Sequence, residues 1–259
     1  MSEKPTLRET LAGSVELFAA GARQSAAILA CALVPACVLV ASAYWATGLT
    51  TQARVNDAIQ GGEWLRPIPV IAAGLARSLA GAFAYLALIL AADARRSGAP
   101  LSLRDAYGFA AERYVAFVLT ALLALAWVCG GLMLFVVPGI VLGARYCLAH
   151  MAAALESERG MTALRRSAQL VAAEAGRALG FLLAAGGLAL FVDIGLSLFA
   201  ALLSGIIESV VGTPAGAVRA QVEVLVSELL SGLVASWLIA FAVLLYRDLA
   251  SRHPPLDQR

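Results

Sequence analysis

Charged residues are scarce in this chain. They make up 14% of its 259 residues, and histidine occurs only twice. A soluble domain carries about 25% charged residues, so this composition argues against a disordered chain and against an ordinary cytosolic enzyme. The net charge is only +2 and no basic run stands out, so we expect no nucleic-acid partner.

Cysteine is also rare, and its positions do not suit cross-linking. The four cysteines all lie within apolar stretches: Cys31, Cys37, Cys129 and Cys147. A disulfide framework or metal site would show paired spacings near loops. We therefore expect no disulfide, no metal and no cofactor, and we treat these cysteines as small apolar residues.

Hydrophobic residues make up 61% of the chain, and its mean hydropathy is +0.84. A bilayer core of about 30 Å requires about 20 apolar residues in a helix. The sequence therefore predicts an all-α integral membrane protein, a single polytopic domain over residues 1–259. Its six predicted transmembrane helices are about 25–46, 68–92, 114–136, 138–155, 178–203 and 222–246.

The third and fourth predicted spans are nearly continuous and together too long for one crossing. We place the break where Gly130–Gly131 and Pro138–Gly139 interrupt the apolar run. Pro138 then stands at a helix start, where its missing N–H costs no hydrogen bond. The sequence predicts a tight helical hairpin here.

Arginine is distributed asymmetrically between the predicted loops. With the N-terminus inside, fourteen basic residues lie on the cytosolic side and three, Arg54, Arg66 and Arg219, lie outside. The positive-inside rule then predicts that both termini are cytosolic. A cleaved signal peptide is the less favoured interpretation of the first span, because about two dozen residues precede the apolar run.

Three predicted cytosolic segments resemble one another and suggest a threefold hairpin repeat. Residues 6–19, 102–112 and 162–176 each carry Leu-Arg near a Ser or Thr and lead into a span. The first has a capping box and the second a weaker copy of one. We predict that all three are amphipathic interfacial helices on the cytosolic side. Their basic residues are Arg8, Arg104, Arg165 and Arg166.

The third copy shows the amphipathic pattern best. At 100° per residue, one face is apolar: Leu164, Ala168, Val171, Ala175 and Ala178. The opposite face is polar: Arg165, Arg166, Gln169 and Arg177. These arginines are expected to face lipid headgroups or the cytosol. An ordinary helix packed under the bundle is the alternative.

The stretch from about Gly131 to Ala178 carries a recognisable pattern: a Pro-Gly-aliphatic turn, a following Arg, a Glu at the span's end and an Ala-Leu-x-Arg-Ser-x-x-Leu helix. These positions are Pro138, Gly139, Ile140, Arg145, Glu156, Ala163, Leu164, Arg166, Ser167 and Leu170. This pattern resembles the membrane domain attached to some bacterial glycerophosphoryl diester phosphodiesterases and its stand-alone relatives. The final "LLYRDLASR", with Tyr246 and Asp248, is similar to the family's ending.

The resemblance covers about a quarter of the chain and implies a modest function. In that family the phosphodiesterase is a separate soluble barrel, and this chain lacks both the room and the residues for it. We therefore expect no enzymatic activity. The resemblance implies a location in the bacterial cytoplasmic membrane.

Five charged residues fall within predicted spans: Arg77, Arg145, Asp193, Glu223 and Glu228. A charge at the bilayer centre costs at least about 2.5–3.5 kcal/mol, so each should face a cavity or a partner. Arg145 would pair with Asp193 or Glu228. Such a pair would lock helix packing, bind an anionic group, or relay protons.

Three classes of function remain from these patterns. We favour a non-catalytic membrane module that engages lipids or a membrane or cytosolic protein partner through its interfacial helices. The alternative is a transporter or lipid-moving protein for an anionic or lipid-like substrate that uses the intramembrane charges. An intramembrane enzyme is the weakest hypothesis, because no catalytic motif is present.

Overall fold

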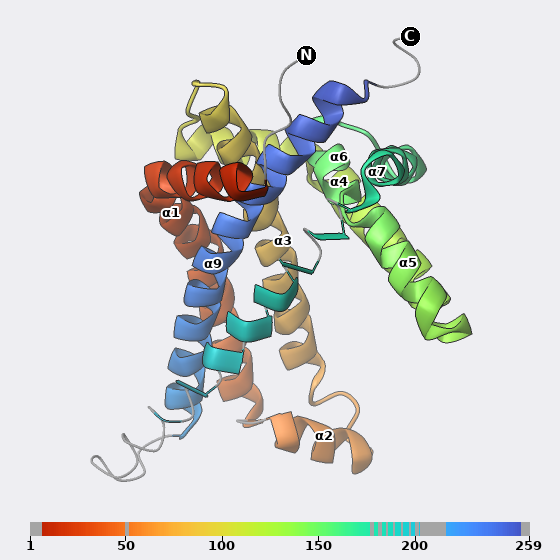
Figure 1. The fold of residues 1–259 in the computed structure, drawn as a ribbon. Coiled ribbons are helices and arrows are strands. Elements are labelled where there is room, and N and C mark those ends of the chain that lie inside the picture. The colour runs from red at the N-terminus through yellow and green to blue at the C-terminus, as the bar shows by residue number, and fades with distance from the viewer. Residues whose placement is uncertain are drawn as a thin grey trace. The chain divides into compact units, whose positions relative to one another are not determined.

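The computed structural model describes residues 7–49, 52–176, 179–180, 183–184, 186–188, 190–192, 194–196, 198–199, 202 and 216–254. Within these ranges it does not describe the side chains of residues 7, 8, 52, 53, 216–226 and 228. The described part contains eight helices and no strand (Figure 1). The predicted all-α class is therefore confirmed.

The helices vary widely in length. They are α1 (Leu7–Thr47), α2 (Gln52–Gln60), α3 (Ile68–Arg96), α4 (Leu103–Leu134), α5 (Val136–Tyr146), α6 (Ala149–Leu155), α7 (Met161–Ala173) and α9 (Gly216–Arg252). Five segments are long and apolar enough to cross a membrane: Glu9–Thr47, Ile68–Arg96, Leu103–Leu134, Val136–Leu155 and Leu229–Arg252. The chain thus has the build of a multi-pass helical membrane protein.

The remaining predicted span, 178–203, lies largely outside the described residues, so the count of six stays a prediction. The predicted interfacial segments 6–19 and 102–112 are continuous with the following spans in α1 and α4. The predicted cap of the second segment is present, because the Asp105 backbone N–H donates to Ser102 Oγ over 3.2 Å.

The chain folds into two compact units. The first unit comprises Met1–Ser25, Tyr85–Ala189 and Ala235–Arg259, and the second comprises Ala26–Ala84 and Leu190–Val234.

In the second unit, the short helix α2 covers a small apolar cluster that the sequence analysis did not predict. Its buried members are Leu49, Val55, Ala58 and Val70. Val55 and Ala58 are three residues apart, so both point to the same side of α2 and bury it. Next to this cluster, Arg66 donates to Glu63 over 2.9 Å and to the Thr47 carbonyl over 3.3 Å. These contacts hold the connection between α1 and α3.

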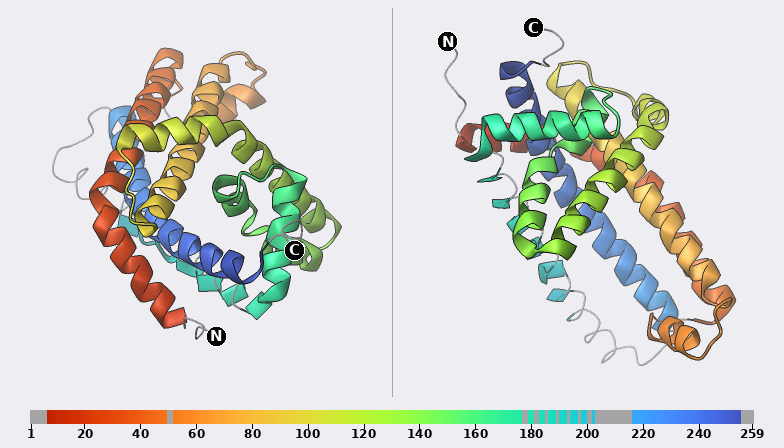
Figure 2. Two further views of the ribbon diagram at one scale, coloured as in Figure 1. Left: turned by 90° about the horizontal axis from the view of Figure 1, so that it is seen from above. Right: turned by 90° about the vertical axis from the view of Figure 1, so that its right-hand side faces the viewer.

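In the first unit, α4 and α5 form the predicted hairpin (Figure 2). The break is a single extended residue, Phe135, which lies between the two predicted glycine positions. Pro138 stands in the first turn of α5, where a missing N–H is harmless. Gly139 packs so closely on α4 that a Cβ there would overlap with the Leu132 side chain. The glycine therefore permits the tight turn.

The tip of this hairpin carries large apolar side chains that no other part of the described chain covers. Met133 is 88% exposed and Phe135 is 75% exposed. Side chains of this type are expected to face lipid in a membrane protein, since contact with water would be unfavourable.

Candidate functional site

The candidate site lies beside a break in the fourth apolar segment, Val136–Leu155. Helix α5 ends at Tyr146 and α6 begins at Ala149, which frees backbone groups that a continuous helix would pair. Ser167 of α7 pairs two of them: its hydroxyl donates to the Arg145 carbonyl over 2.9 Å and accepts from the Leu148 N–H over 3.2 Å. Ser167 is completely buried. One hydroxyl therefore supports the break and fixes α7 against it.

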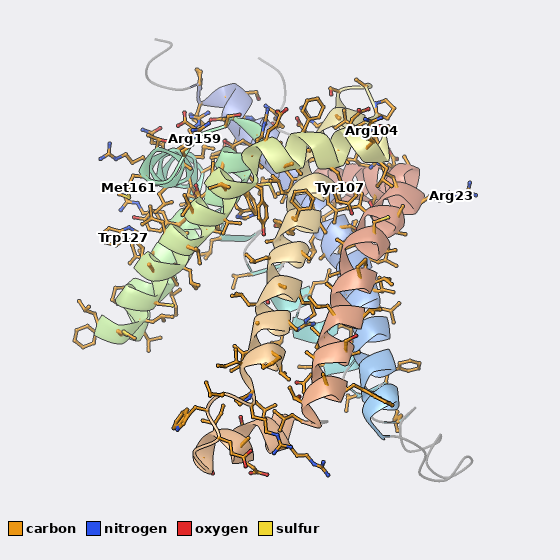
Figure 3. All side chains as sticks on the ribbon, turned by 180° about the vertical axis from the view of Figure 1, so that it is seen from behind. Arg23, Arg104, Tyr107, Trp127, Arg159 and Met161 are labelled. Atoms are coloured by element: carbon orange, nitrogen blue, oxygen red, sulfur yellow. The ribbon has the colours of Figure 1, made fainter. Side chains whose placement is uncertain are left out.

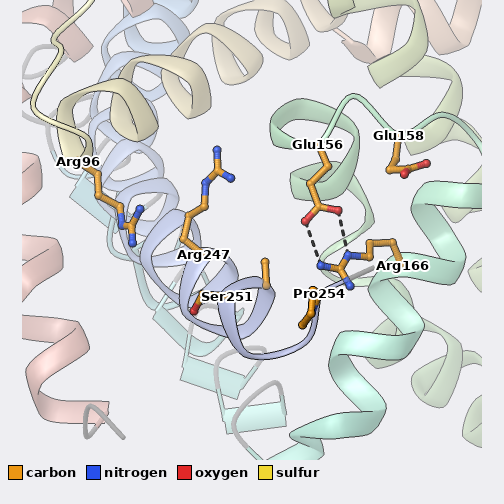
Figure 4. Close-up of a pocket in the computed structure, with 8 residues that line it drawn as sticks. Arg96, Glu156, Glu158, Arg166, Arg247, Ser251 and Pro254 are labelled. Carbon is orange, nitrogen blue, oxygen red and sulfur yellow. Dashed lines mark hydrogen bonds and ion pairs between the residues drawn. The ribbon is translucent and has the colours of Figure 1, made fainter. Parts of the chain in front are cut away.

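The residue before Ser167 forms a buried ion pair. Arg166 Nε donates to Glu156 Oε2 over 2.9 Å, and Nη2 donates to Oε1 over 3.2 Å (Figure 4). The side chains of Arg166 and Glu156 are 6% and 18% exposed. Burial lowers the pKa of Arg166, but the hydrogen bonds and negative charge of Glu156 outweigh it and raise the pKa above its ordinary value. Arg166 therefore stays charged.

The same arginine also holds the end of the last helix. Arg166 Nη1 donates to the His253 carbonyl just beyond α9, over 2.7 Å. Tyr246 of α9 is fully buried beside the Glu156–Arg166 pair. Its hydroxyl lies close enough to interact electrostatically with both Glu156 and Arg166. It has no hydrogen-bond partner within the described part of the chain. Arg166 thus links α6, α7 and α9.

Further ion pairs surround this link in the first unit. Arg247 of α9 holds Asp93 of α3 with two hydrogen bonds of 2.8 and 2.6 Å. Arg252 pairs with Asp248 over 2.8 Å and with Glu174 over 3.7 Å. The bidentate Asp93–Arg247 pair gives a fixed geometry that a single contact would not.

An open cavity of about 580 Å³ lies beside the Glu156–Arg166 pair and Arg247 (Figure 4). Its lining residues are Arg96, Glu156, Glu158, Arg166, Arg247, Ala250, Ser251 and Pro254. In Figure 4, Arg96, Arg247 and Ser251 lie on one side, and Glu156, Glu158 and Arg166 lie on the other. Arg96 is exposed and Glu158 half-buried. The cavity therefore presents both cationic and anionic groups.

Several residues of the predicted motif meet at this site. Glu156, Arg166, Ser167 and Tyr246 come together from α6, α7 and α9, as described above. The other motif residues have supporting positions. Ala163 and Leu164 are buried in α7, Pro138 and Gly139 form the hairpin turn, and Asp248 pairs with Arg252.

The structure partly changes the prediction for α7. Its predicted apolar residues Leu164, Ala168 and Val171 are buried, and they pack on the protein, since α7 contacts α4, α5 and α6. Arg165 and Gln169 are exposed as predicted, but Ala175 is exposed too. Residues 177 and 178 lie outside the described residues.

The expected position of Arg166 on the polar face is wrong. Its side chain is buried because Glu156 and the His253 carbonyl supply partners inside the fold. Helical periodicity gives the direction of a side chain on its own helix, but it contains no information about an acceptor on another element. This arginine is therefore part of the packing and is not presented to headgroups.

The predicted intramembrane charges do not form a cluster within the described residues. The Arg145 side chain is exposed near the end of α5, and its backbone carbonyl accepts the hydrogen bond from Ser167 of α7. Arg77 of the second unit is half-buried. The Asp193, Glu223 and Glu228 side chains lie outside the described residues, as does that of Arg8. The pairing of Arg145 with Asp193 or Glu228 therefore stays a prediction.

The sequence analysis did not assign Arg96 or Glu158, which line the cavity, or Asp93, which pairs with the cavity residue Arg247. Arg247 belongs to the C-terminal ending recognised in the sequence, but no role was predicted for it. Asp93 and Arg96 are at the end of an apolar run, where the positive-inside pattern explains Arg96 without a site. Asp93 pairs with Arg247 across 154 positions, and no local pattern indicates that. No group of three or more metal-binding side chains occurs among the described residues. No family model, no curated protein and no solved structure matches the chain.

Proposed function

We propose that the protein is a non-catalytic membrane module that engages lipids at the arginine-bearing end of its first unit. The observation that carries this proposal is a surface of exposed arginines, called here the arginine surface. Its members are Arg23, Arg104, Arg159 and Arg165. Figure 3 places Arg23, Arg104 and Arg159 toward the same end of the unit.

Charge and hydropathy support lipid as the partner of this surface. Arg104 stands at the start of the segment Leu103–Leu134, and Arg159 follows shortly after the end of Val136–Leu155. The ends of segments long enough to cross a membrane lie at the level of the lipid headgroups. Each basic side chain near an anionic membrane surface contributes about 1 kcal/mol of attraction. Two exposed carboxylates of α4, Asp105 and Glu112, share this surface and reduce the attraction locally.

The rigid attachment of α7 supports a binding role. Ser167 and Arg166 fix this helix to the rest of the first unit and leave Arg165 exposed. A fixed helix presents its charge in one place, which reduces the ordering cost of binding. We do not extend the proposal to transport, because no observation on the described residues favours it over lipid engagement.

Lipid retention by the full chain tests this function. The protein is placed in nanodiscs of mixed phosphatidylglycerol and phosphatidylcholine at about 0.1 M salt, where charges act over about 10 Å. The lipids retained after release are counted by native mass spectrometry. The wild type should retain phosphatidylglycerol preferentially. In the Arg104→Gln/Arg159→Gln/Arg165→Gln variant, the ratio of retained phosphatidylglycerol to phosphatidylcholine should fall by about tenfold or more.

The matched control removes one exposed arginine from α2 of the second unit. Arg54→Gln should leave the lipid preference unchanged, because Arg54 lies in the predicted outer loop. If the triple variant keeps the wild-type preference, the proposal is wrong. If the triple variant instead loses a co-purifying protein and no lipid, the surface serves a protein partner.

A further inference from the structure

We propose that the cavity beside the Glu156–Arg166 pair binds a zwitterionic group that carries a phosphate diester and a primary ammonium. This inference rests on the proposed function, because it names a ligand for the same end of the first unit. The proposed ligand site uses different residues from the arginine surface. Arg96 and Glu158 would hold the ligand, and the outward-facing arginines of α4 and α7 would not.

The position of the cavity favours a headgroup. Three candidate membrane spans end at its lining: Ile68–Arg96, Val136–Leu155 and Leu229–Arg252. Residues at the ends of such spans lie at the level of the headgroups, where phosphate and ammonium groups are concentrated. The volume of about 580 Å³ falls within the usual range for small-molecule sites.

One side of the cavity suits a phosphate. Arg96 forms no ion pair with any other described residue and is free to turn toward a ligand. Arg247 gives its Nε and Nη2 groups to Asp93, which leaves Nη1 without an assigned acceptor in the described structure. Two guanidinium groups on one wall match the oxygens of a phosphate diester. Ser251 adds a hydroxyl beside them (Figure 4).

The opposite side suits an ammonium. The Glu156 carboxylate is already held by Arg166, whereas Glu158 lines the same wall with no ion pair inside the described ranges. A half-buried carboxylate gains by meeting a cation that donates hydrogen bonds. A primary ammonium has three N–H donors, and a trimethylammonium has none. A simple anion would leave Glu158 unmatched and close to a like charge.

Titration of the full chain in detergent micelles tests the proposal. The probes are short-chain phosphatidylethanolamine, phosphatidylglycerol and phosphatidylcholine, followed by calorimetry at about 0.5 M salt. At this salt the Debye length is about 4 Å, which weakens long-range attraction to the arginine surface more than direct contacts within the cavity. Phosphatidylethanolamine should bind at least about tenfold more tightly than the other two, which corresponds to one lost charged hydrogen bond.

Two variants separate the two halves of the site. Glu158→Gln should lower the affinity for phosphatidylethanolamine to that for phosphatidylglycerol. Arg96→Gln should weaken the binding of both lipids by a similar factor. Neither residue has an ion pair among the described residues, so both variants should fold, which far-UV circular dichroism checks. Asp57→Asn on α2 of the second unit is the matched acidic control and should leave the affinity for all three lipids unchanged.

Water-soluble glycerophosphoethanolamine, which carries the same phosphate diester and ammonium, identifies the source of the ligand. If it displaces the lipid at similar concentrations, the site recognises the free compound, and if it does not, the site recognises the headgroup of a membrane lipid. Equal binding of phosphatidylethanolamine and phosphatidylglycerol by the wild type, or an unchanged preference in Glu158→Gln, overturns the inference. If the nanodiscs still show the preference for phosphatidylglycerol, the proposed function holds even though the cavity does not bind this headgroup.

Discussion

Neutralising Glu156 tests whether the buried ion pair holds the first unit together. The Glu156→Gln variant leaves the Arg166 guanidinium, whose side chain is 6% exposed, without its bidentate partner. Leaving a fully buried charge unpaired costs about 3–5 kcal/mol. Water can reach the 18% exposed Glu156 position, so we expect a loss of about 2–4 kcal/mol in the free energy of unfolding.

A double-mutant cycle distinguishes pairing from simple loss of packing. Arg166→Met removes the charge and the hydrogen bond to the His253 carbonyl, and should cost about 1.5–3 kcal/mol. Glu156→Gln/Arg166→Met should then be more stable than the sum of the single losses implies, by about 1–3 kcal/mol. The unpaired buried charge of the Glu156→Gln variant is absent from the double variant, which is why the losses do not add.

Unfolding in mixed micelles of increasing sodium dodecyl sulfate, followed by circular dichroism and tryptophan fluorescence, measures these losses. The control is Glu63→Gln, which breaks an ion pair with Arg66 whose side chains are 55% and 51% exposed. Exposed pairs contribute about 0.2–1 kcal/mol. The reasoning is refuted if Glu156→Gln costs no more than Glu63→Gln, or if the two losses at the buried pair simply add.

Two further predictions concern the hairpin and the helix break. Ser167→Ala should cost about 1–3 kcal/mol of unfolding free energy, because the Leu148 N–H and Arg145 carbonyl both lose a buried partner. The same denaturation assay measures it, and an unchanged midpoint would contradict the role given to this hydroxyl. Gly139→Ala should cost about 1–3 kcal/mol, because the added Cβ meets α4. Gly130→Ala has open space and should be neutral or stabilising by up to about 1 kcal/mol, so equal losses at both glycines would refute the close-packing argument.

Local patterns in the sequence were sufficient to predict the class of protein and several of its structural elements. Low charge and long apolar runs predict the membrane-spanning helices, because the bilayer imposes one length and one composition on all of them. The hairpin break follows from the glycines and Pro138, which act through backbone geometry alone. The Ser102 cap follows in the same way, since its acceptor and donor are three residues apart. The buried face of α7 follows from helical periodicity.

The contacts that build the candidate site could not be predicted from the sequence, because they depend on tertiary structure. A motif indicated Glu156 and Arg166, but only the fold shows that they bind each other and that Arg166 is buried. The periodicity of α7 placed this arginine outside because a helical wheel weighs hydropathy and ignores partners on other helices. The small α2 cluster was missed for a related reason, since nine residues are too few for a clear pattern.

By itself the sequence determined that this chain is a helical membrane protein, because hydropathy and charge act residue by residue, and it predicted that the basic residues gather at one set of loops. Only the tertiary structure decided which of those basic residues face outward and which build the cavity. Arg165 and Arg166 are neighbours with opposite surroundings, one exposed and one buried. Asp93 and Arg247 are 154 positions apart and form one bidentate pair. The physical reason is that a charge is buried only where the folded chain supplies its partner.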